Sequence, residues 1–188
     1  MAGAHYTTLT ASGIAEEFAA IARDTPSAFG RYDTAQLNWQ PNADNWSIAQ
    51  CFDHLLKTNH AMMQAIGRKA DPTLWQRLPF WPRVMGRMLV SSQAPGRKGK
   101  YKAHPTAIPA SSDIEATILD RFVAWQGTGM AAVRGLGAEE SRRIIVSPFL
   151  SQITYSVLDA WRLVAAHQRR HFEQARGVAE HPEFPGRR

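Results

Sequence analysis

Four stretches of the chain repeat apolar side chains every three to four residues, and this period constrains the fold more than any other feature. The stretches cover about residues 9–24, 47–66, 113–134 and 154–178. Apolar residues at this spacing form one face of an α-helix, which is buried against other helices. No stretch alternates apolar and polar residues over strand length, although residues 144–146 can form a brief extended piece. The pattern predicts an all-α fold, and four such helices indicate a four-helix bundle.

Breaking and capping residues give the expected ends of these helices. Pro26 interrupts the pattern after the first helix, and Asn45 or Ser47 is suited to cap the second. Ser112 or Asp113 is expected to start the third helix.

Residues 72–112 form an irregular segment between the second and third helices. Its first half contains enough apolar residues for short helical pieces, which Pro79 and Pro82 are expected to interrupt. The second half, from Ala94 to Ser112, is a loop rich in proline, glycine and basic residues with little to bury. We expect this loop to be the most mobile internal region, with fast amide hydrogen exchange.

Length and composition limit the class of protein. The 188 residues suit a single domain over residues 1–188. No apolar stretch approaches the roughly 20 residues of a membrane span, and the N-terminus lacks the basic start and apolar core of a secretory signal peptide. Cys51 is the only cysteine, which excludes a disulfide framework and a cysteine-clustered metal site. We therefore expect a cytoplasmic protein with no membrane span.

The positive charge of the chain is concentrated in one segment. The formal net charge is +6, but residues 72–112 contain seven bases and no acid, and the remaining residues carry a net charge of −1. This distribution does not favour a specific nucleic-acid partner, because such proteins usually spread bases along a face or groove. For the aromatic and basic residues of segment 74–102, three interpretations stay open: packing across the end of the bundle, a substrate lid or anion site, and contact with a membrane surface.

Three histidines have a spacing that suits a metal site. His167 and His171 lie four residues apart in the fourth helix, on one face and about one turn apart, so both imidazoles can reach one divalent ion. His54 lies in the middle of the second helix and can add a third nitrogen from a facing helix. Such a site leaves positions open for water or substrate, as in catalytic zinc sites. Solvated or hydrogen-bonded helix histidines are the alternative, and the absence of a Glu after His167 excludes a thermolysin-like peptidase.

The remaining candidates have simpler interpretations. We expect the other four histidines to be exposed polar residues: His5, His60, His104 and His181. Cys51 is interpreted as core packing, and Ser47 as a helix cap. Trp39 and Trp46 are interpreted as lids over the core, with a pocket wall as the alternative. Asp53 or Asp159 can orient a ligand imidazole by accepting its second N–H.

Two motifs together resemble the DinB/YfiT-like superfamily. In residues 37–55, LNWQPNADNWSIAQCFDHL, the pair Trp46–Ser47 precedes Gln50, with His54 four residues after that Gln. The last helix carries HxxxHxxQ, matched by His167, His171 and Gln174. The resemblance covers nearly all of residues 9–178. It implies a four-helix bundle in which His54, His167 and His171 hold a divalent metal ion.

The resemblance also implies a range of functions. Relatives include transferases and isomerases that depend on bacillithiol, mycothiol or glutathione, and fold alone does not assign the reaction. An open site can favour the deprotonated form of a thiol, for S-transfer, or of water, for hydrolysis. We expect zinc or nickel as the metal, a small-molecule substrate, a possible low-molecular-weight thiol cofactor and a homodimer.

Both the role of Gln50 and the function of the whole chain have alternative interpretations. Gln50 is the candidate catalytic residue, able to hydrogen-bond a ligand, and the alternative for it is a polar contact between helices. The alternative for the chain is a non-catalytic metal-binding or stress-associated interaction protein, and after that a basic nucleic-acid-binding module.

Overall fold

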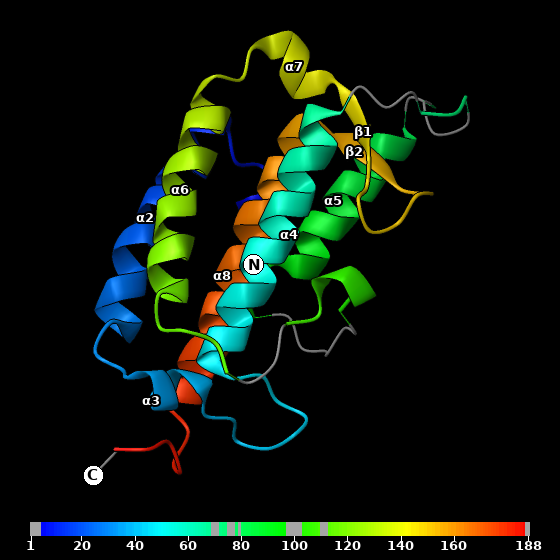
Figure 1. Cartoon of the computed structure of the whole chain (residues 1–188). Helices are drawn as coiled ribbons and strands as arrows, with labels where there is room; N and C mark the ends of the chain where they lie inside the picture. The colour runs from blue at the N-terminus through cyan, green and yellow to red at the C-terminus, as the bar shows by residue number, and fades with distance from the viewer. Residues whose placement is uncertain are drawn as a thin grey trace.

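Four long helices, two running in each direction, form the body of the molecule (Figure 1). In the computed structural model the described residues are 5–68, 72–74, 78, 80–96, 103–109 and 113–186. The bundle helices are α2 (Ala11–Phe29), α4 (Ile48–Gly67), α6 (Ile118–Arg134) and α8 (Val157–Ala179). Helices α2 and α4 each pack against both α6 and α8. The predicted all-α four-helix bundle is confirmed.

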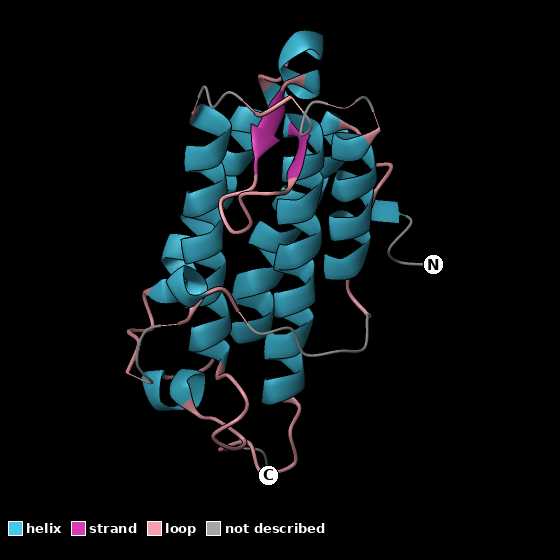
Figure 2. Cartoon of the chain, turned by 90° about the vertical axis from the view of Figure 1, so that its right-hand side faces the viewer, coloured by secondary structure: helices cyan, strands magenta, loops and turns pink. Residues whose placement is uncertain are grey.

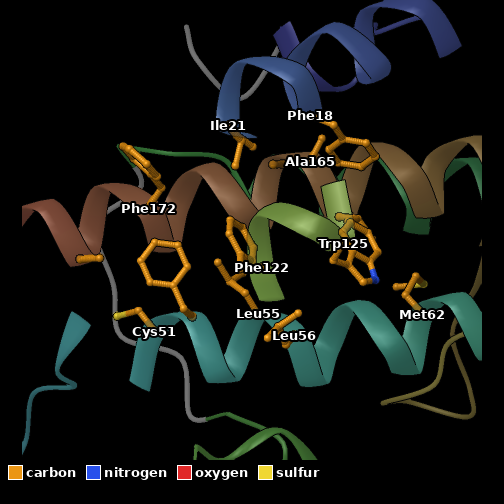
Figure 3. Packing of buried hydrophobic residues seen from close by; sticks show 14 of the residues in the cluster. Phe18, Ile21, Cys51, Leu55, Leu56, Met62, Phe122, Trp125, Ala165 and Phe172 are labelled. Atoms are coloured by element: carbon orange, nitrogen blue, oxygen red, sulfur yellow. The ribbon is translucent and has the colours of Figure 1, made fainter. Parts of the chain in front are cut away.

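Aromatic side chains from all four helices interlock in the core. The Phe52 ring lies between Phe29 and Phe122, at centroid distances of 5.3 and 4.8 Å, in edge-to-face contacts. One layer further along the bundle, Phe18 of α2 contacts Trp125 of α6 and Trp161 of α8. Figure 3 shows part of this packing, with Phe18 and Phe122 directed into the space between the helices. This continuous apolar core fixes α4 next to α8, and these two helices carry the three candidate histidines.

Helix α2 is longer than predicted, because Pro26 lies inside it and not after it. A proline within a helix removes one backbone hydrogen bond, at a cost of about 3 kcal/mol. The residues beyond Pro26 nevertheless stay helical as far as Phe29, which is fully buried against Phe52 and Phe172. Packing of this aromatic side chain offsets the local cost.

Helix α6 starts at Ile118, five residues after the predicted Asp113. The Asn38 side chain accepts a hydrogen bond from the Ile114 backbone N–H and donates one to the Ile114 carbonyl. These two bonds hold residues around Ile114 outside the helix. The short helix α3 (Thr34–Asn38), which supplies Asn38, was not predicted.

The irregular segment contains one well-formed helix. Helix α5 (Trp81–Gln93) packs on α8 outside the bundle. The prediction that Pro82 interrupts short pieces was wrong, because Pro82 lies in the first turn of α5, where its missing N–H has no helical partner to lose. Pro79 lies outside the described residues. A 3-10 turn, η2 (Pro105–Ala107), follows later in the segment.

Two short strands close the end of the bundle near α7 (Ala138–Arg142). Strands β1 (Ile144–Val146) and β2 (Thr154–Ser156) pair antiparallel, with Ile145 opposite Tyr155 (Figure 2). The extended piece at 144–146 is therefore confirmed, while residues 154–156 belong to β2 and not to the last helix. None of the helices among the described residues is long and apolar enough to cross a membrane.

Candidate metal centre

The three histidines singled out from the sequence meet between α4 and α8. His54 points from the middle of α4 toward His167 and His171, which lie one turn apart on α8. The His54 ring centroid lies 5.0 Å from that of His167 and 4.6 Å from that of His171, and the last two are 4.6 Å apart. One ring nitrogen from each residue falls within 4.8 Å of the other two. Among the described residues, no fourth His, Cys, Asp or Glu joins this group.

A backbone carbonyl fixes the orientation of His54. The Nδ1 atom of His54 lies 2.6 Å from the carbonyl oxygen of Ala107 in η2. A carbonyl oxygen only accepts hydrogen bonds, so Nδ1 carries the proton and Nε2 carries the lone pair. The lone pair is then directed at the other two histidines. Metal-binding histidines typically have a partner of this kind on the second ring nitrogen.

The spacing of one pair of ring nitrogens fits two ligands of a single divalent ion. The Nε2 atoms of His54 and His167 are 3.2 Å apart. Two ligands bound to zinc at 2.0–2.1 Å with a tetrahedral angle between them lie about 3.3 Å apart. The Nδ1 atom of His171 is buried and has no hydrogen-bond partner within the described part of the chain. Three imidazoles that converge in this way are the donor set expected of zinc, nickel or a similar ion.

Burial keeps the three imidazoles neutral. Removal from water lowers the pKa of His54 and lowers that of His171 to about 3. The pKa of His167 falls well below its ordinary value because of burial and the two neighbouring histidines. Neutral imidazoles have a free lone pair, which a metal ion requires. The cluster is therefore ready to bind a cation at neutral pH.

Trp46 forms one wall of the cluster. Its ring stacks on His171, with centroids 5.7 Å apart and planes inclined by 24°, and its centroid lies 4.8 Å from that of His54. Trp46 thus packs against the apolar core, as expected of a lid, and also against the histidine cluster. Trp39 lies elsewhere, packed on His181 and Phe184 of the C-terminal tail.

Gln50 has a structural role at the start of α4. Its side-chain oxygen accepts hydrogen bonds from the Ser47 backbone N–H and from Gln40 Nε2, while Ser47 caps the Gln50 N–H. This reciprocal arrangement is a capping box, which satisfies the free amides of the helix N-terminus. The predicted cap at Ser47 is confirmed. A catalytic role of Gln50 stays a prediction.

Within the described part of the chain, the hydrogen bonds and ion pairs of the two aspartates suggested as partners for an imidazole go to other groups. Asp53 forms an ion pair with Lys57, whereas the Asp159 carboxylate accepts a hydrogen bond from the hydroxyl of Ser156, the N-cap of α8, and pairs with Arg162. The Ala107 carbonyl binds His54 in their place. Sequence reasoning missed Ala107 because its contribution comes from the backbone and carries no residue-type signal. Lys57 also donates a hydrogen bond to the Ile108 carbonyl, so α4 holds the same turn at two points.

The remaining candidates mostly have the expected surroundings. His5, His60 and His104 are exposed, whereas His181 is half-buried against Trp39, which corrects the expectation for that residue. Gln174, the last residue of the HxxxHxxQ motif, is exposed on α8. The side chain of Cys51 is fully buried, as predicted.

Comparison with known proteins supports the family that the motifs at α4 and α8 indicate. The family model of the DinB superfamily matches residues 17–175. The chain belongs to the DinB superfamily. It is also 25% identical over 149 residues to the uncharacterized protein YuaE of Bacillus subtilis (strain 168), in an alignment that covers 77% of this chain and 84% of the relative. No solved structure matches the chain.

The DinB superfamily match includes the whole histidine cluster. It runs from within α2 to within α8 and so contains His54, His167 and His171. The comparisons therefore support the family and the fold, while the reaction is a separate question.

Proposed function

We propose that this DinB superfamily protein is a divalent-metal-dependent enzyme that activates a small thiol or water for attack on a small-molecule substrate. One observation carries the proposal: three neutral imidazole nitrogens converge between α4 and α8, with no fourth protein ligand among the described residues. Structural zinc sites use four protein ligands, whereas catalytic sites use three and leave a position open. The open position is where a thiol or water would bind.

The chain supplies the binding and the orientation. His54, His167 and His171 would hold the ion, with His54 kept in one tautomer by the Ala107 carbonyl. The indole of Trp46 covers His54 and His171 on one side and limits access of water there. A bound divalent ion would supply a Lewis acid that favours the deprotonated nucleophile at neutral pH. The first candidates for the ion are zinc and nickel, which imidazole ligands suit.

Metal content is the first test. The protein is purified without a polyhistidine tag, loaded with zinc or nickel, and analysed by elemental mass spectrometry and calorimetry. We expect one ion per chain, and loss of at least 100-fold in affinity when any one of the three histidines is replaced by alanine, on the order of the largest effects seen for partners of metal ligands. His60→Ala is the matched control, since His60 is an exposed histidine of the same α4 helix. Unchanged affinity in the triple-alanine variant would contradict the proposal.

Turnover distinguishes the reactions. The loaded protein is mixed with an electrophile and, in separate reactions, with glutathione, bacillithiol, mycothiol or cysteine, and a parallel series contains an activated ester without thiol. Formation of a thioether that needs both metal and thiol indicates S-transfer, and metal-dependent ester cleavage without thiol indicates hydrolysis. If the protein binds metal but neither reaction proceeds above the His54→Ala background, the non-catalytic alternative holds.

A further inference from the structure

Helix α5 has one face buried against the bundle and an exposed apolar stripe on the opposite face. The residues buried against the bundle are Pro82, Gly86 and Val90, spaced by one turn. Gly86 lies so close to α8 that an added Cβ would be 2.7 Å from Asp159 Oδ2. At Gly86 the two helices are therefore in close contact, with no room for a larger side chain at that position.

The outer face carries an apolar stripe. Phe80, Val84 and Met88 follow one another at four-residue spacing, and their exposed fractions are 62%, 50% and 51%. Each is offset by two residues from a buried position of the inner face, which is about 200° around a helix. We call these three residues the α5 stripe. Leu74 and Leu78, also exposed, precede it along the chain. An exposed apolar patch of this kind marks an interaction surface.

The charges around the α5 stripe are positive. Arg83 and Arg87 are exposed on the same helix. They belong to the stretch 72–112, which has seven bases and no acid in the sequence. Helices that lie on membrane surfaces combine an apolar face with flanking Arg or Lys, and their binding depends on anionic lipids.

A groove of about 570 Å³ adjoins the start of α5. Its walls include the apolar side chains of Leu78, Ile144 and Leu158, and two arginines, Arg83 and Arg142. The acidic residue on its wall, Asp159, is paired with Arg162. A groove with apolar walls and two guanidinium groups suits a lipid whose headgroup carries a phosphate.

We propose that the α5 stripe, with Arg83 and Arg87, docks this protein on the surface of an anionic phospholipid bilayer. The α5 stripe enters the interface between headgroups and acyl chains, and the arginines contact lipid phosphates. The protein attaches to one leaflet and does not span it, in agreement with the short length of α5.

Charge complementarity favours a bilayer over a second copy of the chain. A symmetric dimer through the α5 stripe would place Arg83 and Arg87 of both copies at the same interface, and like charges destabilise such a contact. Nucleic acid would satisfy the arginines but would leave the exposed apolar side chains of the α5 stripe uncovered. An anionic membrane surface satisfies both features.

Vesicle flotation tests the proposal with the full-length protein. The probes are vesicles of phosphatidylcholine alone and of phosphatidylcholine with phosphatidylglycerol at about 3:1. We expect binding to the anionic vesicles only, and loss of binding when ionic strength rises to about 1 M, where the Debye length is about 3 Å. Phe80→Ser/Met88→Ser should reduce the partition coefficient at least tenfold. Arg83→Gln/Arg87→Gln should reduce it about 30-fold, from roughly fivefold per basic residue.

Matched controls separate the α5 stripe from general effects. Leu150→Ser replaces an exposed apolar residue outside the α5 stripe, and Arg23→Gln/Arg121→Gln removes the same charge from α2 and α6. Both controls should bind like the wild type, and circular dichroism checks that every variant is folded. The proposal is overturned by binding that does not depend on anionic lipid, by equal losses in the controls, or by a wild-type dimer in analytical ultracentrifugation that Phe80→Ser/Met88→Ser dissociates.

Discussion

Seven histidines occur in the chain, and their surroundings divide them by function. His54 and His171 are buried, and His167 lies against both, so desolvation lowers the pKa of all three. His60 lies on the same helix as His54 but faces outward. The i,i+4 spacing and the two motifs had identified His54, His167 and His171 from the sequence as candidate metal ligands. The Ala107 carbonyl that orients His54 could not be identified, since any residue type provides it.

Trp46 should report on metal binding. Its ring contacts His54 and His171, so an ion bound between these residues lies close to the indole. Nickel quenches indole emission at short range, and we expect titration with nickel to quench part of the tryptophan fluorescence with a stoichiometry of one. Trp46→Phe should remove most of this change, while Trp39→Phe, a substitution in the tail contact, should retain it. Equal quenching in Trp46→Phe would place the ion elsewhere.

Cys51 should resist alkylation in the native protein. Burial raises the pKa of its thiol to about 12, and only the thiolate reacts. Between pH 7 and 9 the protonated thiol predominates in the folded protein, so labelling should stay slow even though the small thiolate fraction rises with pH. Iodoacetamide labelling followed by mass spectrometry should be at least 1000-fold slower than in guanidinium chloride, where the pKa returns to about 8.5. Rapid native labelling would show that α4 opens locally.

At the scale of helices, tertiary contacts determine the helix ends that the local sequence signals predicted incorrectly. Pro26 is a strong breaking signal, but burial of Phe29 carries α2 past it. Asp113 is a suitable cap, but the side chain of Asn38, distant in the sequence, binds Ile114 and delays α6. Local patterns of apolar, capping and breaking residues predicted correctly that the helices exist. The contacts that set these helix ends join residues far apart in the sequence, so a local pattern does not contain them.

The close approach of α5 to α8 predicts the effect of a single methyl group. Gly86→Ala would place Cβ 2.7 Å from Asp159 Oδ2, an atom that also bonds the Ser156 cap. We expect a loss of about 1–3 kcal/mol in the free energy of unfolding, as for overpacking of a filled site. Gly127→Ala, in α6 with open space around its Cβ, should instead gain up to about 1 kcal/mol from helix propensity. Urea unfolding measures both, and a neutral Gly86→Ala would mean that α5 shifts freely.

At the scale of the whole molecule, the bundle and the family could be predicted from the sequence, whereas the contacts of the segment between α4 and α6 could not. The period of the apolar residues predicted the four helices, and the two motifs at α4 and α8 predicted membership of the DinB superfamily. The expected mobility of the loop from Ala94 to Ser112 concerns in part residues 97–102 and 110–112, which lie outside the described residues. Its turn at Pro105–Ala107 packs on α4 through His54 and Lys57, a long-range contact that the loop composition did not indicate.

Metal binding should stabilise the molecule without being needed for its fold. The ligands join α4 to α8, which the apolar core already holds side by side, so the protein freed of metal by a chelator should keep its helical circular dichroism. An ion at a free concentration of 100 times its Kd adds about 2.7 kcal/mol of stability. For a chain of this size we expect Tm to rise by about 5–10 °C. His171→Ala should lose this shift and His60→Ala should keep it, whereas unfolding of the chelated wild type would mean that the ion, and not the core, holds the two helices together.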